Sequence, residues 1–176
     1  MTPVVYLDSS AITKLLVEEP ERQDLRQFLE SRPDRVTSIV GAIEVGRAVW
    51  RQDPTQLASL AAVWEGIGRI ALDQAVVDRA ATLDPPGLRT LDAIHLASAL
   101  ELGSDLSVLV TYDVRFADAA RRQGIAVASP GAAPRDPAGR AVREFALARS
   151  YEGPADFEPS PAEQESKHAS RMASAS

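Results

Sequence analysis

The sequence predicts an α/β fold, a three-layer α/β/α architecture in which a central parallel sheet of four to five strands lies between two layers of helices. Short runs rich in β-branched residues alternate along the chain with longer stretches of helical periodicity. The clearest of these runs are almost continuously apolar, which is typical of strands buried on both faces of a parallel sheet. With 176 residues, the chain is long enough for one domain with a sizeable core.

Five runs are predicted as strands, at residues 4–7, 35–38, 69–72, 107–112 and 125–129. The stretches between them are predicted as helices, at residues 9–32, 39–52, 56–68, 74–83, 90–103 and 114–124. The first of these is interrupted at Pro20, because proline lacks the backbone N–H that a helix interior needs. In an open parallel sheet the functional site lies outside the carboxyl ends of the strands, where the strand order reverses.

The composition changes after Pro130, and this change predicts the domain organisation. Residues 1–130 are expected to form one compact domain. Residues 131–176 form a tail rich in Pro, Ser and Ala that holds five of the twelve prolines. This tail is expected to be largely disordered, with a candidate short helix at 138–151, because it has little apolar surface to bury.

The overall composition narrows the classes of function. The chain has no cysteine, which excludes disulfides and thiolate metal sites and favours a cytoplasmic location. No apolar stretch is long enough to cross a membrane, and we expect no membrane association. The formal net charge of −6 argues against indiscriminate binding to nucleic acid through a basic surface. A bound metal ion can nevertheless invert the field of an acidic site.

Four acidic residues draw attention by their positions. Asp8 and Asp113 each follow a predicted strand, whereas Glu44 and Asp92 lie on helices that are otherwise strongly apolar. Each has an ordinary structural explanation when taken alone. Asp8 and Asp113 could be helix N-caps, Glu44 could pair with Arg47 three residues further on, and Asp92 could complement the helix dipole.

Taken together, the four acids predict a metal site. Carboxylates crowded into one cleft repel one another unless protons or cations intervene. Hard divalent cations such as Mg²⁺ take oxygen ligands of this kind, and Mn²⁺ accepts the same ligands. We therefore expect Mg²⁺, with Mn²⁺ as a plausible substitute, at the carboxyl edge of the sheet.

The chain contains four segments, in this order between residues 4 and 130: YLDSSAITKLL, IVGAIEVGRAV, RTLDAIHLASALELG and LVTYDVRFADAARRQGI. Together they resemble the PIN-domain family, and more narrowly the VapC-type toxins of bacterial type II toxin–antitoxin systems. The resemblance implies a PIN-like parallel sheet flanked by helices in residues 1–130. It also implies a Mg²⁺-dependent endoribonuclease that an antitoxin keeps inactive.

The resemblance also carries residue roles onto the matching positions of this chain. It implies that the same four acids are both catalytic residues and metal ligands: Asp8, Glu44, Asp92 and Asp113. Ser10 matches a hydroxyl residue that supports the first aspartate, and Asp118 matches a further acid near the site. The implied partners are a VapB-like antitoxin, a second copy of the chain in a homodimer, and a structured RNA such as tRNA or rRNA.

The expected chemistry is phosphodiester hydrolysis by a metal-activated water, which leaves a 5′-phosphate and a 3′-hydroxyl. A ribonuclease that works without metal commonly uses two histidines as acid and base. Here the candidates are His95 and His168; the second lies in the tail, and the first is expected to pack or hydrogen-bond locally.

Three basic residues lie near the predicted cleft and are candidate contacts to RNA phosphates: Lys14, Arg89 and Arg115. For each of them an ordinary solvated surface charge is an equally good explanation.

Two rival functions remain open from the sequence. One is a Mg²⁺-dependent phosphohydrolase with Asp8 as nucleophile, although that chemistry usually places a second acid two residues later, where this chain has Ser10. The other is a catalytically silent PIN-like interaction module. The complete set of four acids argues against this second rival.

Overall fold

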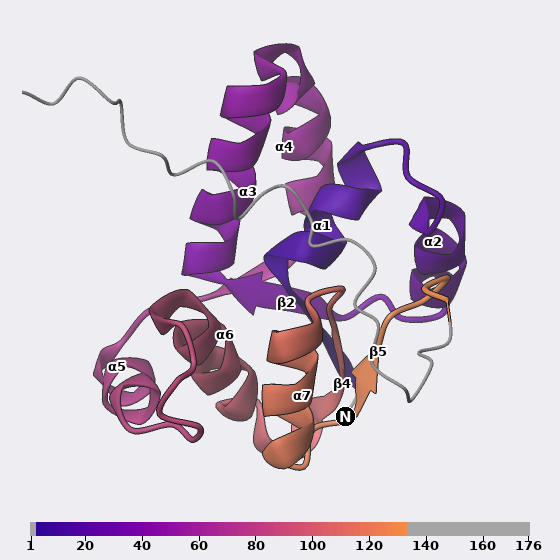
Figure 1. Cartoon of the computed structure of the whole chain (residues 1–176). Helices are drawn as coiled ribbons and strands as arrows, with labels where there is room; N and C mark the ends of the chain where they lie inside the picture. The colour runs from indigo at the N-terminus through magenta and orange to yellow at the C-terminus, as the bar shows by residue number, and fades with distance from the viewer. Residues whose placement is uncertain (1–2, 134–176) are drawn as a thin grey trace, which may run out of the picture. The chain divides into compact units, whose positions relative to one another are not determined.

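The structure, a computed structural model, describes residues 3–133 and contains a five-stranded, fully parallel sheet with helices on both faces (Figure 1). The strands are β1 (Val4–Leu7), β2 (Arg35–Ser38), β3 (Gly68–Ile70), β4 (Leu106–Val110) and β5 (Val127–Ala128). Their order across the sheet is β3-β2-β1-β4-β5, and every neighbouring pair is parallel. The predicted three-layer fold is therefore confirmed.

The helices lie within the stretches predicted for them. They are α1 (Ser9–Leu16), α2 (Arg22–Glu30), α3 (Ile39–Gln52), α4 (Leu57–Glu65), α5 (Gln74–Ala81), α6 (Thr90–Leu100) and α7 (Val114–Arg122). Short 3₁₀ turns at Pro54–Gln56 and Gly103–Asp105 precede α4 and β4. Pro20 falls between α1 and α2, as the interrupted pattern predicted. The third and fourth strands begin one residue earlier and end two residues earlier than predicted.

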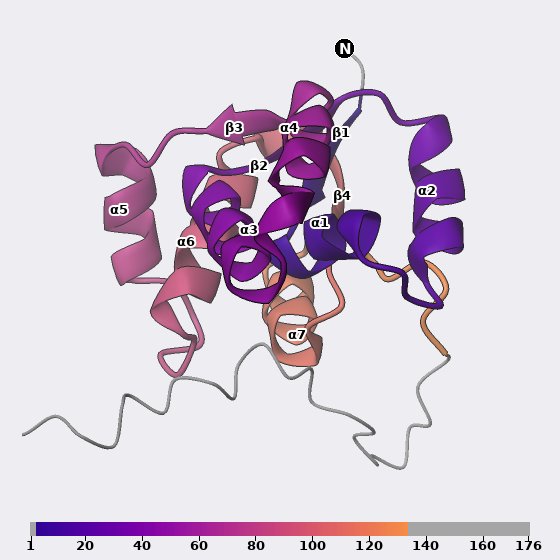
Figure 2. The same cartoon turned by 90° about the horizontal axis from the view of Figure 1, so that it is seen from above.

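Successive side chains of the central strands point to opposite faces of the sheet and build two separate cores. Val5 and Leu7 of β1 pack with α1, α2, α3 and α4, whereas Tyr6 between them packs with α6 and α7. Figure 1 shows the same division, with α1, α3 and α4 above the sheet and α6 and α7 below it. In the view of Figure 2, α5 and α2 lie at opposite ends of the sheet. Tyr6 is fully buried, so its hydroxyl must find a partner inside the protein.

The strand order reverses direction between β1 and β4. The chain passes from β1 outward to β2 and β3, and returns to place β4 on the other side of β1. The carboxyl ends of β1 and β4 therefore form the topological switch point, where open parallel sheets bind their ligands. The Asp8 N–H donates a hydrogen bond to the Val110 carbonyl (3.0 Å), which ties the two strand ends together.

The described residues fall within one compact unit, Met1–Arg135. The tail proposed for residues 131–176 lies outside the described residues beyond residue 133, and so does the candidate helix at 138–151. Among the helices of residues 3–133, none has the length and apolar character that crossing a bilayer requires.

Candidate active site

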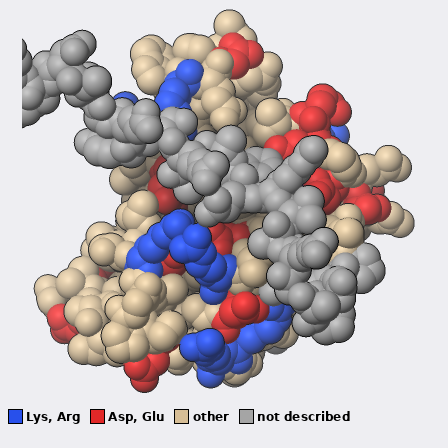
Figure 3. All heavy atoms as spheres, in the orientation of Figure 1, with Lys and Arg blue, Asp and Glu red and all other residues tan. Residues whose placement is uncertain are grey.

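Asp8 and Asp113 both leave the sheet at the switch point. Asp8 follows β1 directly and is the N-cap of α1, and Asp113 stands three residues after β4 as the N-cap of α7. The N-cap explanation for these two residues is therefore correct, but it coexists with a shared position at one edge of the sheet. Figure 3 shows acidic and basic side chains meeting on this face, over the region that α6 and α7 occupy in Figure 1.

Two hydroxyl groups fix the orientation of the buried Asp8 carboxylate. Ser10 Oγ and Thr111 Oγ1 donate hydrogen bonds to Asp8 Oδ2, at 2.7 and 2.8 Å. The same hydroxyls accept hydrogen bonds from the backbone N–H groups of Tyr112 and Asp113, both at 3.0 Å. Each hydroxyl thus uses its proton on Asp8 and is held in place from behind. Oδ1 of Asp8 is left for other partners, and it lies 3.8 Å from the nearer His95 nitrogen.

Asp92 shares the electrostatic field of the other two aspartates. It lies in the first turn of α6, half-buried. Burial raises the pKa of Asp92, the negative charges of Asp113 and Asp8 raise it further, and Arg89 opposes them; the result is a pKa of about 6. Three carboxylates from β1, α6 and the start of α7 therefore stand close enough to penalise one another's ionisation.

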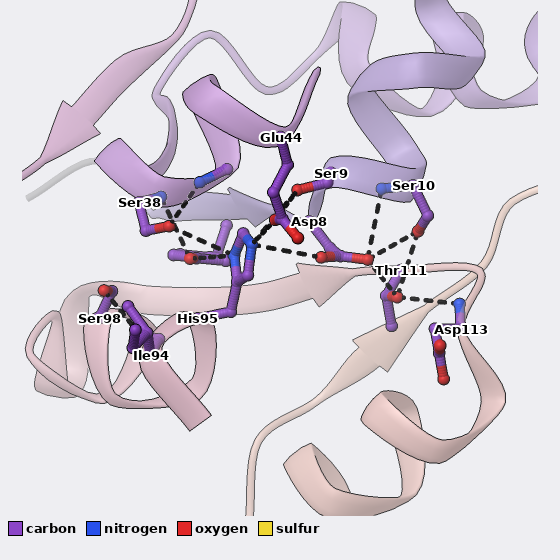
Figure 4. Close-up of polar contacts among 12 residues, drawn as sticks. Asp8, Ser9, Ser10, Ser38, Glu44, Ile94, His95, Ser98, Thr111 and Asp113 are labelled. Carbon is purple, nitrogen blue, oxygen red and sulfur yellow. Dashed lines mark hydrogen bonds and ion pairs between the residues drawn. The ribbon is translucent and has the colours of Figure 1, made fainter. Parts of the chain in front are cut away.

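Glu44 reaches the same place from α3, but its carboxylate is already engaged (Figure 4). Its Oε2 accepts hydrogen bonds from Ser9 Oγ at 2.6 Å and from His95 Nε2 at 2.7 Å. Burial raises the pKa of Glu44, but the hydrogen bonds from His95 and Ser9 and the charge of His95 outweigh it, so the net shift is downward. The predicted alternative, a pairing of Glu44 with Arg47, is wrong, because the partners of Glu44 come from α1 and α6.

The donor set suits a hard divalent cation. Within residues 3–133, no three acidic or histidine side chains are arranged as a ready-made set of metal ligands. One reason is visible in the contacts, since Glu44 is turned to His95 and Asp113 Oδ1 caps α7. Mg²⁺ keeps several waters and needs only one or two protein carboxylates. The uncompensated repulsion that raises the pKa of Asp92 is the feature that a cation would relieve.

The remaining candidates lie in different surroundings. The prediction for Lys14 needs correction, because its side chain is buried and pairs with Glu19 and Glu21. Its Nζ lies 4.6 Å from the centre of the Tyr112 ring. It is therefore a structural cation between α1 and the start of α2, and the predicted contact of Lys14 to RNA phosphate does not fit this burial.

Two exposed basic residues and one further acid flank the acidic side chains. Arg89 precedes α6, and its charge lowers the pKa of Asp92, so it is close to the site. Arg115 is exposed on the first turn of α7, next to Asp113. Asp118 lies one turn further along α7, exposed, and accepts a hydrogen bond from Arg121 at 3.0 Å. Asp118 is thus engaged on its own helix.

Three site residues were missed by the sequence-based prediction. Thr111 and Ser9 orient Asp8 and Glu44 through their hydroxyls. His95 was expected to pack or hydrogen-bond locally, but it reaches Tyr6 and Glu44, which are 89 and 51 residues away in the sequence. A polar residue at the end of a buried strand, and a histidine on an apolar helix, were the available signals.

Helix α3 packs so closely against His95 that position 41 has no room for a side chain larger than that of glycine. A Cβ atom at this position would lie 2.7 Å from His95 Cε1 and 2.6 Å from Thr37 Oγ1. Gly41→Ala is therefore expected to lower the free energy of unfolding by about 1 to 3 kcal/mol, because neither neighbour has room to move. Urea denaturation measures the difference.

Gly46, on the same helix, is the matched control for Gly41. A Cβ atom there would meet nothing within 4 Å. Gly46→Ala should raise the free energy of unfolding by roughly 0.5 to 1 kcal/mol through helix propensity. Equal effects of the two alanines would contradict the close approach of α3 to His95.

Comparisons with known proteins agree with this architecture. The sequence profile of the PIN domain matches residues 5–122. Ribonuclease VapC46 of Mycobacterium tuberculosis (strain H37Rv) is 45% identical over 126 residues, which cover 72% of this chain and 97% of that protein. Ribonuclease VapC47 of M. tuberculosis (strain CDC 1551) is 40% identical over 134 residues, covering 73% and 98%.

A solved structure shows the same fold at lower sequence identity. The crystal structure of M. tuberculosis VapC20, described as a sarcin–ricin loop cleaving toxin, superposes with a TM-score of 0.55. It is 15% identical and covers 65% of this chain and 94% of its own. With its profile match and its close relatives, the chain belongs to the PIN-domain family, and within that family to the VapC type. The predicted family resemblance is confirmed.

Proposed function

We propose that this protein is the toxin of a toxin–antitoxin pair and a Mg²⁺-dependent endoribonuclease that hydrolyses phosphodiester bonds in structured RNA, of the tRNA or rRNA class. The ribonuclease activity follows from the family, since relatives at 37–45% identity over most of their length are named ribonucleases. We also propose a cytoplasmic location, which the absence of cysteine suits. The metal and the kind of RNA go beyond the family assignment.

One observation carries the metal dependence. Asp8, Asp92 and Asp113 share a field in which burial and mutual repulsion raise the pKa of Asp92 to about 6. Such an arrangement costs stability in the protein alone, and a divalent cation would compensate it. Carboxylate oxygens, with waters completing the shell, are the ligands that Mg²⁺ and Mn²⁺ prefer.

The residues divide the catalytic work according to their contacts. Asp8 and Asp92 would hold the ion, with Asp113 and Glu44 completing the acidic set. When bound, Mg²⁺ supplies a Lewis acid that polarises the phosphate and lowers the pKa of water. Ser10 and Thr111 keep Asp8 Oδ2 occupied, so Oδ1 is the oxygen available to a ligand.

The RNA substrate would be bound by basic residues beside the acids. Arg89 and Arg115 are the exposed basic residues beside the acids, and we assign them to RNA phosphates.

We further propose that a VapB-like antitoxin inhibits the enzyme and that the chain forms a homodimer. Light scattering at micromolar concentration tests the dimer, and a monomer there would contradict it.

The proposed activity predicts a specific cleavage product. Purified, antitoxin-free protein incubated with total RNA and Mg²⁺ should generate fragments with 5′-phosphate ends, because water is the nucleophile. EDTA should abolish cleavage, and Mn²⁺ should restore it. Ligation-based sequencing of 5′ ends identifies both the chemistry and the RNA. Intact RNA under all conditions, or fragments with 2′,3′-cyclic phosphate ends, would contradict the proposal.

A further inference from the structure

His95 is fully buried on α6 and yet has polar partners at both ring nitrogens. Its side chain is 2% exposed, and its ring packs edge-on against Tyr6 and Phe116, with ring centres 6.0 Å apart in each case. The partners come from β1, α1, α3 and the end of β2. The proposed function gives this residue no role.

The Nδ1 side of the ring is anchored in the core. Tyr6 Oη lies 2.8 Å from His95 Nδ1, and it also accepts a hydrogen bond from the Ser38 N–H at 3.1 Å. The phenol oxygen can accept from the Ser38 N–H and at the same time donate its own proton to Nδ1. A neutral ring with its proton on Nε2 satisfies every one of these groups.

The Nε2 side of the ring faces the acidic site. Glu44 Oε2 lies 2.7 Å from Nε2, Ser9 Oγ lies 3.2 Å away, and Asp8 Oδ1 lies 3.8 Å away. An ionised carboxylate only accepts hydrogen bonds, so the short contact to Glu44 requires a proton on Nε2. The contacts at Nε2 therefore require a proton on that nitrogen, and the contacts at Nδ1 are compatible with it.

We propose that His95 is a positioning residue: its Nε2–H donates to Glu44 Oε2 and fixes that carboxylate beside Asp8 for phosphodiester hydrolysis. This role rests on the proposed function. With Oε2 held by His95 and Ser9, Oε1 is the Glu44 oxygen that makes no hydrogen bond within the described residues, and it is the one left for the reaction. Partners behind a site that fix the direction of a carboxylate commonly control metal affinity and rate.

The surrounding backbone leaves the ring little freedom to turn away. Gly41 on α3 approaches so closely that an added Cβ would lie 2.7 Å from His95 Cε1. Tyr6 is itself fully buried and held by Ser38. The same contacts that bury His95 therefore set the direction of its Nε2–H bond.

Nitrogen NMR of the metal-free protein tests the proton position without any assay of activity. Long-range ¹H–¹⁵N spectra at pH 8 distinguish the protonated from the unprotonated ring nitrogen, and the His95→Asn spectrum assigns the His95 signals. We expect Nε2 of His95 to carry the proton. A ring with Nε2 unprotonated would overturn the proposal, whatever the activity of the enzyme.

Two substitutions then test whether the donor matters for the reaction. His95→Gln places an amide N–H near the position of Nε2, whereas the shorter His95→Asn keeps a polar group near Tyr6 but does not reach Glu44. His95→Asn should reduce kcat, or raise the Mg²⁺ concentration needed for half-activity, by about 10- to 100-fold. His95→Gln should recover most of that loss. Melting temperatures of both variants separate this effect from unfolding.

The outcomes distinguish the inference from the proposed function. If both variants match the wild type, or if both lose activity equally, the donor role is overturned. If the wild type itself shows no Mg²⁺-dependent cleavage, the proposed function fails, while the NMR result still decides where the proton lies. Rescue by glutamine alone supports the positioning role.

Discussion

Replacing Asp8 with asparagine should reduce RNA cleavage on the order of 10³-fold while leaving the fold intact. The substitution removes a charge that we assign to metal binding, and a lost metal contact removes several kcal/mol of transition-state stabilisation. Asparagine is as good an N-cap as aspartate, so α1 should keep its start. Single-turnover cleavage of a defined RNA, with the melting temperature recorded in parallel, measures both quantities.

Asp73 offers a matched control for Asp8. It is the N-cap of α5, where its Oδ1 accepts a hydrogen bond from the Val76 N–H at 3.0 Å, and it is exposed. Asp73→Asn makes the same chemical change at the same kind of helix position, and we expect cleavage to continue at the wild-type rate. If Asp8→Asn were as active as Asp73→Asn, Asp8 would have no part in the chemistry.

The second large effect concerns Asp92 and the dependence of stability on pH. Its pKa of about 6 in the folded state exceeds the ordinary value of 3.8, so the folded protein binds more protons than the unfolded chain between these values. The free energy of unfolding therefore falls as the pH rises through this window. In EDTA at pH 7, Asp92→Asn should raise the free energy of unfolding by about 1 to 2 kcal/mol. This is less than the full pKa shift would give, because Asp92 is partly exposed and solvent screens its charge.

Bound metal should restore the free energy of unfolding that the ionised Asp92 lowers. Adding Mg²⁺ at pH 7 should stabilise the wild type and have a much smaller effect on Asp92→Asn, because a cation that binds only the folded state shifts the equilibrium. At pH 4.5, where Asp92 is protonated, the Mg²⁺ effect on the wild type should largely disappear. Denaturation in EDTA and in Mg²⁺ at both pH values gives the four comparisons. An equal Mg²⁺ effect on both proteins would contradict metal binding at Asp92.

The sequence predicted the sheet, its helices and the acids at the switch point because these depend on patterns that are local in the chain. Apolar runs mark the strands, and an acid after a parallel strand must lie at the carboxyl edge of the sheet. Asp8 and Asp113 follow from this logic without any knowledge of side-chain contacts. Pro20 likewise marked the break between α1 and α2, since proline cannot continue a helix.

The directions of the side chains could not be predicted in the same way. Glu44 has Arg47 one turn away, yet it binds His95 from another helix, 51 residues further along the chain. Lys14 has a long flexible stem, and its ammonium turns toward Glu19 and Glu21. Such partners are brought together by the tertiary fold, and no periodicity in the sequence encodes them.

An acidic residue can cap a helix and also lie in the candidate active site, so a structural explanation for one residue does not exclude a catalytic role. Asp113 Oδ1 accepts hydrogen bonds from the N–H groups of Arg115 and Phe116, which is an ordinary N-cap. The same residue contributes to the raised pKa of Asp92. A carboxylate has two oxygens, and one can cap a helix while the other remains for a ligand.

Crystals of the protein grown with Mn²⁺ would test the central claim most directly, because anomalous scattering locates the ion without assumptions. We expect an anomalous peak within coordination distance of carboxylate oxygens of Asp8 and Asp92, with waters completing its shell. A peak at an unrelated site, or no peak while the acids stay engaged with protein partners alone, would contradict a metal-dependent active site at the junction of β1 and β4.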